Sequence, residues 1–335
     1  VQWVILGVSL LSLFILWGCD MIKMPGSSYA GPLPPLTEEE ENIARRLELH
    51  IGRLAGEIGE RNLWHPEALE ESALYIEATL SDLGFAVSRQ PYRVDGVEVR
   101  NLEIRLPGTG RAGEIIVAGA HYDSVADCPG ADDNASGVAG LLEIARLLKG
   151  RRFSRTVVLA AFVNEEPPFF QTARMGSAVY AAAARRRGEK IVAALSLETI
   201  GYYSDEPGSQ AYPPPFSAAY PDRGNFIGFV GNLSSKTLVR ECVASFRRHT
   251  AFPSEGVAAP SSIPGIGWSD HWAFWQEGYP ALMVTDTATF RYPHYHKASD
   301  TPDKMVFPKF AEVVAGVALS VRELVNPGEG GKKSK

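Results

Sequence analysis

Apolar runs of strand length alternate with amphipathic helical segments from residue 37 to residue 325, and this alternation constrains the fold more than any other feature of the sequence. Three of these runs are each long enough for one buried strand, namely residues 114–120, 156–163 and 191–197. Strands that alternate with helices predict a sheet whose strands are mainly parallel. We therefore predict an α/β fold, a three-layer α/β/α sandwich with a mixed, largely parallel central sheet.

The antiparallel part of this sheet is predicted near the start of the domain. Residues 85–94 and 97–106 have strand composition and flank Asp95-Gly96, a pair of residues that is typical of a hairpin turn. The folded domain is predicted to span residues 37–326, because Thr37 and Glu40 form a capping box at the start of its first helix. Residues 327–335 are predicted to be a disordered tail.

The N-terminal 18 residues contain no charged side chain and are rich in Val, Ile, Leu, Phe and Trp. Their length and position indicate a signal segment or a membrane anchor, with a buried core helix as the alternative. They end in Leu16-Trp17-Gly18-Cys19, which resembles a bacterial lipoprotein cleavage site with Cys19 as the lipidated residue. Residues 19–36 are rich in Pro, Gly and Ser and are predicted to be a linker.

From this terminus we expect a bacterial, exported protein on the periplasmic or extracellular face. Its membrane anchor would be residues 1–18 or a lipidated Cys19. The net charge of −6 and the scattered basic residues argue against nucleic acid as a partner. Three cysteines are too few for a disulfide framework, and whether Cys128 pairs with Cys242 stays open, as does the oligomeric state.

Acidic residues and histidines follow the predicted strands, where ligands bind in α/β sheets. His121-Tyr122-Asp123 follows the first of the three apolar runs, Glu165 and Glu166 follow the second, and Glu198 ends the third. A carboxylate two residues from a histidine is suited to orient a metal-bound imidazole. Of two adjacent glutamates, one can bind a metal while the other moves a proton. Each signal alone is weak, because such residues also form ordinary hydrogen-bonded pairs.

Two further segments complete the set of candidates. Asp133 lies just before a predicted helix, where the simplest interpretation is an N-cap. Tyr295 and His296 lie in a late loop, in which His294 competes with His296 for a ligand role. Asp270-His271 is interpreted as a structural hydrogen-bonded pair at a helix start.

In their order, these motifs resemble peptidase family M28, a family of zinc peptidases. The resemblance covers residues 37–325 and rests on five matched motifs: His121-Tyr122-Asp123, Asp133-Asn134 with Ser136-Gly137, Glu165-Glu166, Glu198 with Gly201, and Tyr295-His296 before Asp300-Thr301. It implies two zinc ions per chain and peptide substrates.

The resemblance also implies a role for each matched residue. His121 and Glu198 would bind one zinc ion, Glu166 and His296 the other, and Asp133 would bridge both. Asp123 would orient His121. Glu165 would be the general base, and Tyr295 would donate a hydrogen bond to the developing oxyanion. Hydrolysis would use a water activated by the two zinc ions.

Two departures from the family pattern affect specificity. Glu198 stands where many members carry Asp, and residues 167–174 make the connection after Glu166 longer than usual. We predict that this insertion lines the substrate entrance. An acidic cluster offers a binding place for a substrate ammonium group, which favours an aminopeptidase over a carboxypeptidase-type member of the family. Two further functions stay open: a single-zinc glutaminyl cyclase-like acyltransferase, suggested by His121 to Ser124, and a non-catalytic binding domain.

Overall fold

The computed structural model describes residues 20–214 and 216–327, so the predicted anchor at 1–18 and Cys19 lie outside the described residues, as does the predicted tail from residue 328. The strands are β1 Val87–Val94, β2 Val97–Leu106, β3 Arg111–His121, β4 Arg155–Phe162, β5 Lys190–Glu198, β6 Ile227–Asn232, β7 Ser254–Ala259 and β8 Ala281–Thr285. The α-helices are α2 Glu38–Ile51, α3 Pro66–Asp82, α4 Gly137–Leu148, α5 Gly176–Arg186, α6 Lys236–His249, α7 His271–Gln276 and α8 Phe307–Val325.

The strands form one sheet in the order β1-β2-β4-β3-β5-β8-β6-β7. Its centre, β4-β3-β5-β8, is parallel, and β6 and β7 are parallel to each other. The pairs β1-β2, β2-β4 and β6-β8 are antiparallel. The predicted mixed, largely parallel sheet is therefore confirmed. The predicted hairpin is confirmed as well, because Val94 pairs with Val97 across the turn.

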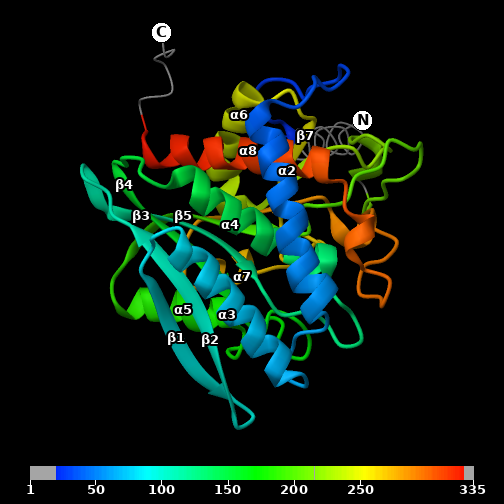
Figure 1. Ribbon diagram of the computed structural model, residues 1–335. Coiled ribbons are helices and arrows are strands. Elements are labelled where there is room, and N and C mark those ends of the chain that lie inside the picture. The colour runs from blue at the N-terminus through cyan, green and yellow to red at the C-terminus, as the bar shows by residue number, and fades with distance from the viewer. Residues whose placement is uncertain (1–19, 215, 328–335) are drawn as a thin grey trace, which may run out of the picture.

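Helices cover both faces of this sheet, which gives the predicted three layers (Figure 1). One face packs against α3, α4, α6 and α8, and α2 packs on α4 and α8. These elements share the largest apolar cluster among the residues that the structure describes. The other face packs against α5 and α7, where Phe162 of β4 contacts Tyr180 and Phe274. These two faces explain why the central strands are apolar along their whole length instead of alternating with polar residues.

The first helix begins as the sequence predicts. The Thr37 hydroxyl accepts a hydrogen bond from the Glu40 backbone N–H at 3.3 Å, and Glu40 accepts one from the Thr37 N–H at 2.7 Å. Both bonds satisfy backbone donors that the helix itself leaves free. The strand β7, an edge strand of small residues, was not predicted. The helix start predicted at Asp270-His271 is the start of α7, which is only 6 residues long.

The predicted linker makes specific contacts with the domain. Asp20 pairs with Lys236 and Arg240 of α6 at 2.5 and 2.9 Å, and the Ser28 hydroxyl accepts a hydrogen bond from Ser254 N–H at 2.9 Å. Met21 is buried in a small apolar cluster. Residues 20–36 are therefore in contact with the domain, whereas their composition predicts a linker with few such contacts. No helix in residues 20–214 or 216–327 is long and apolar enough to cross a membrane.

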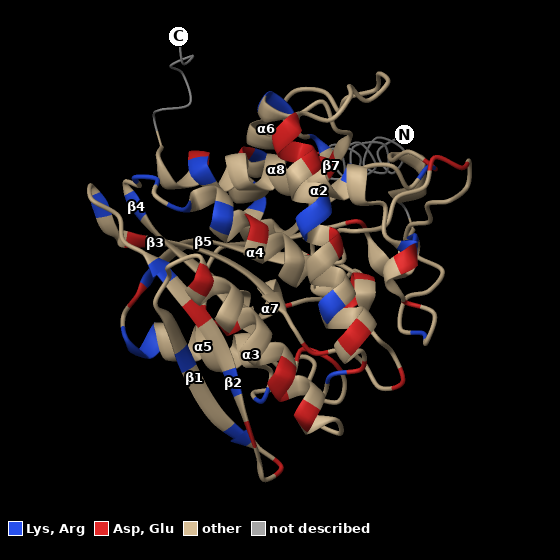
Figure 2. Ribbon diagram, in the orientation of Figure 1, with Lys and Arg blue, Asp and Glu red and all other residues tan. Residues whose placement is uncertain are grey.

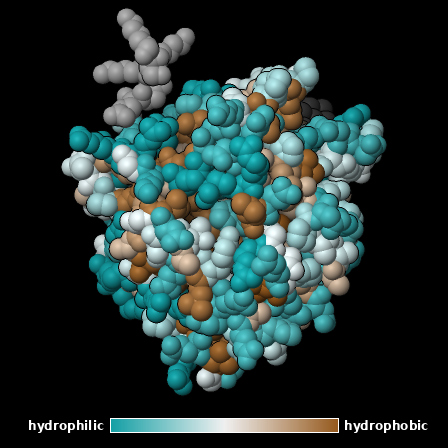
Figure 3. All heavy atoms as spheres, in the orientation of Figure 1, coloured by the Kyte–Doolittle hydropathy of each residue, from teal (hydrophilic) through white to brown (hydrophobic). Residues whose placement is uncertain are grey.

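Charged residues of both signs are interspersed over the ribbon, and basic side chains form no continuous stripe in this view (Figure 2). The visible face is mainly hydrophilic, with scattered apolar groups (Figure 3).

Candidate metal centre

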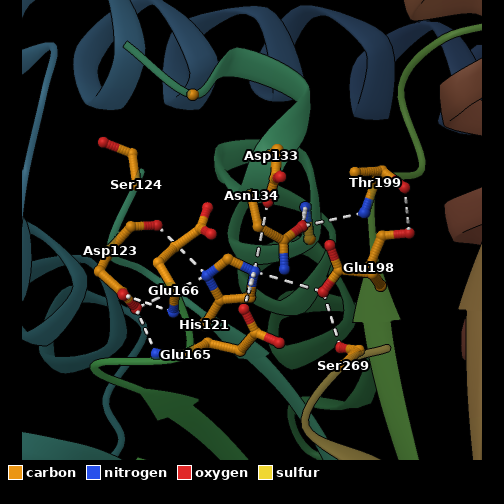
Figure 4. Close-up of polar contacts among 12 residues, drawn as sticks. His121, Asp123, Ser124, Asp133, Asn134, Glu165, Glu166, Glu198, Thr199 and Ser269 are labelled. Carbon is orange, nitrogen blue, oxygen red and sulfur yellow. Dashed lines mark hydrogen bonds and ion pairs between the residues drawn. The ribbon is translucent and has the colours of Figure 1, made fainter. Parts of the chain in front are cut away.

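The candidate residues meet at the carboxyl edge of the parallel strands. His121 is the last residue of β3, Glu198 is the last residue of β5, and Glu165 and Glu166 follow the end of β4. Since these three strands are parallel neighbours, their carboxyl ends lie side by side. Asp133 comes from the turn before α4 (Figure 4).

The side chains form two groups that share Asp133. The Nε2 atom of His121 lies 3.4 Å from Oδ1 of Asp133 and 3.3 Å from Oε2 of Glu198. The Nε2 atom of His296 lies 3.0 Å from Oδ2 of Asp133 and 3.3 Å from Oε2 of Glu166. In each group the potential ligand atoms all lie within 4.8 Å of one another, as they do around one metal ion.

Several of these buried nitrogen and oxygen atoms have no hydrogen-bond partner. His121 Nε2, His296 Nε2, Asp133 Oδ1 and Glu166 Oε1 are buried and have no aligned hydrogen-bond partner. Each of the two histidine nitrogens lies at ion-pair distance from an oxygen of Asp133. Buried polar atoms are rarely left unpaired, because each costs about 1–3 kcal/mol. A set of imidazole nitrogens and carboxylate oxygens is a typical zinc ligand set, so these residues fit zinc.

The charges of the metal-free side chains support the same conclusion. Burial raises the pKa of Glu165 well above its usual value, and the nearby Glu198 and Glu166 add to this. Burial, followed by the charge of Asp133, raises the pKa of Glu166 to about 7. Burial also opposes ionisation of Asp133, but His121 and His296 outweigh it and lower the pKa of Asp133 below its usual value. The carboxylates thus need a positive partner, which a divalent cation supplies while displacing protons.

Asp123 contacts more than the histidine that it is predicted to orient. Its Oδ1 lies 3.6 Å from Nδ1 of His121, whose closer neighbour is the backbone oxygen of Asp123 at 3.2 Å. The two carboxylate oxygens also accept hydrogen bonds from the backbone N–H groups of Glu165 and Glu166 at 3.2 and 3.1 Å. Asp123 therefore positions both glutamates as well as the imidazole.

Asp300 has the same function on the other side of the centre. Its carboxylate accepts hydrogen bonds from the backbone N–H groups of Asp132 and Asp133 at 2.9 and 3.1 Å, and from the Tyr292 hydroxyl at 2.8 Å. The sequence placed Asp300 in a motif without indicating this role. Ser269 was missed completely, because no local signal marks it; its hydroxyl donates to Oε2 of Glu198 at 2.7 Å.

The remaining candidates lie beside the two ligand groups. Glu165 belongs to neither group, and its Oε2 lies 3.8 Å from His121 Nε2. The Tyr295 ring stacks on the His296 ring at 3.9 Å, and burial raises the pKa of Tyr295, so that its hydroxyl stays protonated. His294 is not part of either group; its Nδ1 lies 2.8 Å from the Ser299 hydroxyl near the surface.

An apolar cavity opens next to the ligands. Its wall includes Glu198 and Tyr295, and the rest of the lining is mainly aromatic and aliphatic, including Phe216, Phe229, Ile266, Trp268, Met283 and Phe290. The Pro-rich segment 207–221, predicted only as a loop, supplies part of this lining. Cys128 and Cys242 are both buried and are not paired with each other.

Comparison with known proteins identifies the family. The model of peptidase family M28 matches residues 101–321. The uncharacterized protein YfbL of Escherichia coli K12 is 41% identical over 282 residues, which cover 81% of this chain and 85% of YfbL.

Two solved structures share the fold. BSAP, a zinc aminopeptidase from Bacillus subtilis, matches with a TM-score of 0.69 and 16% identity over 87% of this chain and 96% of that chain. A glutaminyl cyclase from Fimbriiglobus ruber matches with a TM-score of 0.62 and 20% identity over 88% and 97%. The match to the family model and the identity to YfbL establish the family: this chain belongs to peptidase family M28 and is a zinc metallopeptidase that carries out metal-dependent hydrolysis of peptide bonds.

Proposed function

We propose that this peptidase is a two-zinc aminopeptidase that removes N-terminal residues from peptides. The observation that carries the proposal is the pair of ligand groups joined by Asp133. His121 and Glu198 would hold one zinc ion, Glu166 and His296 the other, and Asp133 would contact both. Bound zinc supplies a Lewis acid and lowers the pKa of water to about 7.

The side chains around the ligands would then carry out the proton transfers. Glu165 lies beside both ligand groups without belonging to either, so it is free to accept the proton of the attacking water. Its raised pKa suits a group that must later return this proton to the leaving amine. The Tyr295 hydroxyl would donate a hydrogen bond to the developing oxyanion, a contact worth about 3 kcal/mol.

The surroundings of the centre favour a free substrate N-terminus. The ammonium group of a peptide would be attracted by the buried carboxylates of Glu165, Glu166 and Glu198, whereas a substrate C-terminal carboxylate would be repelled. The apolar cavity next to Glu198 and Tyr295 would accept the first side chain of the peptide. Both features favour an aminopeptidase over a carboxypeptidase.

A substrate comparison tests this proposal. The zinc-loaded protein is expected to hydrolyse leucinamide and Leu-Phe, to leave N-acetyl-Leu-Phe intact, and to lose activity with a chelator and regain it with zinc. Equal hydrolysis of the free and the N-acetylated dipeptide would contradict the requirement for an N-terminal amine.

A single-zinc glutaminyl cyclase is the second candidate, because a cyclase shares the fold and His121 to Ser124 resembles that group. The presence of a second set of ligands, formed by Asp133, Glu166 and His296 next to the first, argues for the hydrolase. Zinc content separates the two. Two tightly bound ions per chain are expected for the aminopeptidase, and a value near one together with cyclisation of an N-terminal glutamine would favour the cyclase.

We also propose that the protein is exported and held at a membrane, either by residues 1–18 or by a lipid on Cys19. The support is the uncharged apolar run in the sequence. Fractionation of Cys19→Ala distinguishes the two anchors: retention in the membrane indicates the apolar segment, and release indicates the lipid. Recovery of the full-length wild-type protein in the soluble fraction would contradict both.

A further inference from the structure

We propose that Trp64 and Phe169 form a subsite for the side chain of the substrate residue that follows the scissile bond, and that this subsite prefers large apolar or aromatic side chains. The inference rests on the proposed aminopeptidase activity and names a specificity determinant for it. Trp64 and Phe169 are far apart in the sequence, but their rings stack with centroids 6.4 Å apart and an interplanar angle of 22°.

The backbone of Phe169 is hydrogen bonded to that of Glu166, one of the proposed zinc ligands. Phe169 lies in the insertion after Glu166, and its backbone N–H donates to the Glu166 carbonyl oxygen at 2.9 Å. Its side chain is almost completely buried, and the Arg174 guanidinium lies 5.1 Å from the ring centre. The Gln171 side chain in the same insertion donates a hydrogen bond to the Gly267 carbonyl oxygen at 3.0 Å. This bond also holds the insertion to the segment that lines the apolar cavity. The ring of Phe169 is therefore a fixed support.

The Trp64 segment is hydrogen bonded to the residues that follow the neighbouring strand, β3. The Asn62 side chain donates to the Ser124 carbonyl oxygen at 3.2 Å, and the Ser124 N–H donates to the Arg61 carbonyl oxygen at 2.9 Å. The backbone N–H of Trp64 donates a hydrogen bond to the side-chain oxygen of Asn62 at 3.1 Å. This segment thus runs beside the residues that directly follow Asp123.

The Trp64 side chain is nevertheless 58% exposed, which is unusual for a large ring that already has an aromatic partner. The segment is anchored by hydrogen bonds that do not involve the indole, so the exposed ring has no evident role in holding the fold together. An exposed aromatic face on a fixed support, anchored to the segments that follow β3 and β4, is suited to stack on a substrate side chain.

The position of Trp64 and Phe169 outside the cavity lining indicates which substrate residue they would contact. The cavity proposed for the first side chain is lined by residues 198–295 and includes no residue of 61–64 or 167–174. Trp64 and Phe169 are instead attached to the segments that carry Asp123 and Glu166. A peptide with its first side chain in the cavity and its scissile bond at the ligands would place its next residue toward this pair.

The test compares leucinamide, Leu-Ala and Leu-Phe as substrates of the zinc-loaded full chain. In the wild-type protein, stacking is expected to make kcat/KM roughly tenfold higher for Leu-Phe than for Leu-Ala. Trp64→Ala is expected to reduce this ratio to about twofold or less, and its loss on Leu-Phe should exceed its loss on leucinamide at least about fivefold. Trp64→Phe should restore much of the preference, because a smaller aromatic face remains.

Leu74→Ala is the matched control, because Leu74 is also an exposed apolar side chain, 48% exposed, but lies on α3. It should keep the wild-type ratio. Equal kcat/KM for Leu-Phe and Leu-Ala in the wild-type protein, or equal losses on all three substrates in Trp64→Ala, would overturn the subsite while leaving the aminopeptidase in place. Failure of the wild-type protein to hydrolyse leucinamide would instead overturn the proposed function, and the subsite with it.

Discussion

Replacing Arg61 with methionine is expected to destabilise the protein strongly, because this buried guanidinium holds the loop between two proposed zinc ligands, His121 and Asp133. Its Nε donates to the Tyr122 carbonyl oxygen at 2.7 Å, and its Nη2 donates to that of Gly130 at 2.8 Å. Its Nη1 reaches the carbonyl oxygens of Gly59 at 3.0 Å and Pro129 at 2.5 Å. The side chain is fully buried and has no carboxylate within salt-bridge distance among the residues that the structure describes.

The magnitude follows from the carbonyl groups that would lose their donor. Those of Tyr122 and Gly130 are buried, and each unsatisfied buried group costs about 1–3 kcal/mol. Methionine recovers part of this loss, because a buried charge no longer has to be desolvated; that burial already lowers the pKa of Arg61. We therefore expect a loss of about 4 kcal/mol, a large part of the roughly 5–15 kcal/mol that stabilises a typical domain.

Urea unfolding of the metal-free protein measures this change directly. The midpoint should fall by roughly 1.5 M for a slope of 2–3 kcal/mol/M. Zinc affinity should fall roughly 10–100-fold, because the loop carries His121 and Asp133 at its two ends. Arg45→Met is the control: this arginine is 64% exposed and should change stability by less than about 0.5 kcal/mol. An Arg61→Met protein within about 1 kcal/mol of the wild type would refute the reasoning.

Three further predictions concern the metal centre and the N-terminal segment. Glu165→Gln should keep both zinc ions and lose nearly all turnover, because it removes a proton acceptor but no ligand; more than a few per cent of wild-type kcat would contradict this. His296→Ala should lower zinc content and activity, whereas His294→Ala should leave zinc content nearly intact, and the opposite result would exchange their roles. A protein starting at Thr37 should fold, but with a lower Tm and with a several-fold higher KM for peptides whose first residue is apolar. The reason is that residues 20–36 pack near the cavity wall. An unchanged Tm and an unchanged KM would show that the segment is only a tether.

Local patterns in the sequence were enough to predict the fold and most of the candidate site. Each apolar run is a strand in the structure, and the residues chosen at the strand ends, such as His121 and Glu198, do lie at the carboxyl edge of the sheet. This works because parallel strands place their carboxyl ends together whatever the connections between them. The short strand β7 was missed, because six mostly small residues carry too little periodicity to separate strand, helix and loop.

The sequence also missed residues that act through backbone contacts. Arg61 bonds to carbonyl oxygens up to 69 positions away, and Ser269 bonds to Glu198 across 71 positions. A carbonyl or an N–H group exists at nearly every position of a chain, so no residue pattern marks which of them such a side chain will meet. The same reason hid the positioning roles of Asp123 toward Glu165 and of Asp300 toward Asp133.

What this sequence determined by itself is the order of strands and helices and the chemistry of the strand ends, because those depend on local periodicity and on residue type. The tertiary structure alone decided that Trp64 stacks on Phe169 and that the Pro-rich loop helps to line an apolar cavity. These are contacts between segments far apart in the chain. Their geometry is set by how the helices and loops pack on the sheet, and packing leaves no periodic trace in the sequence.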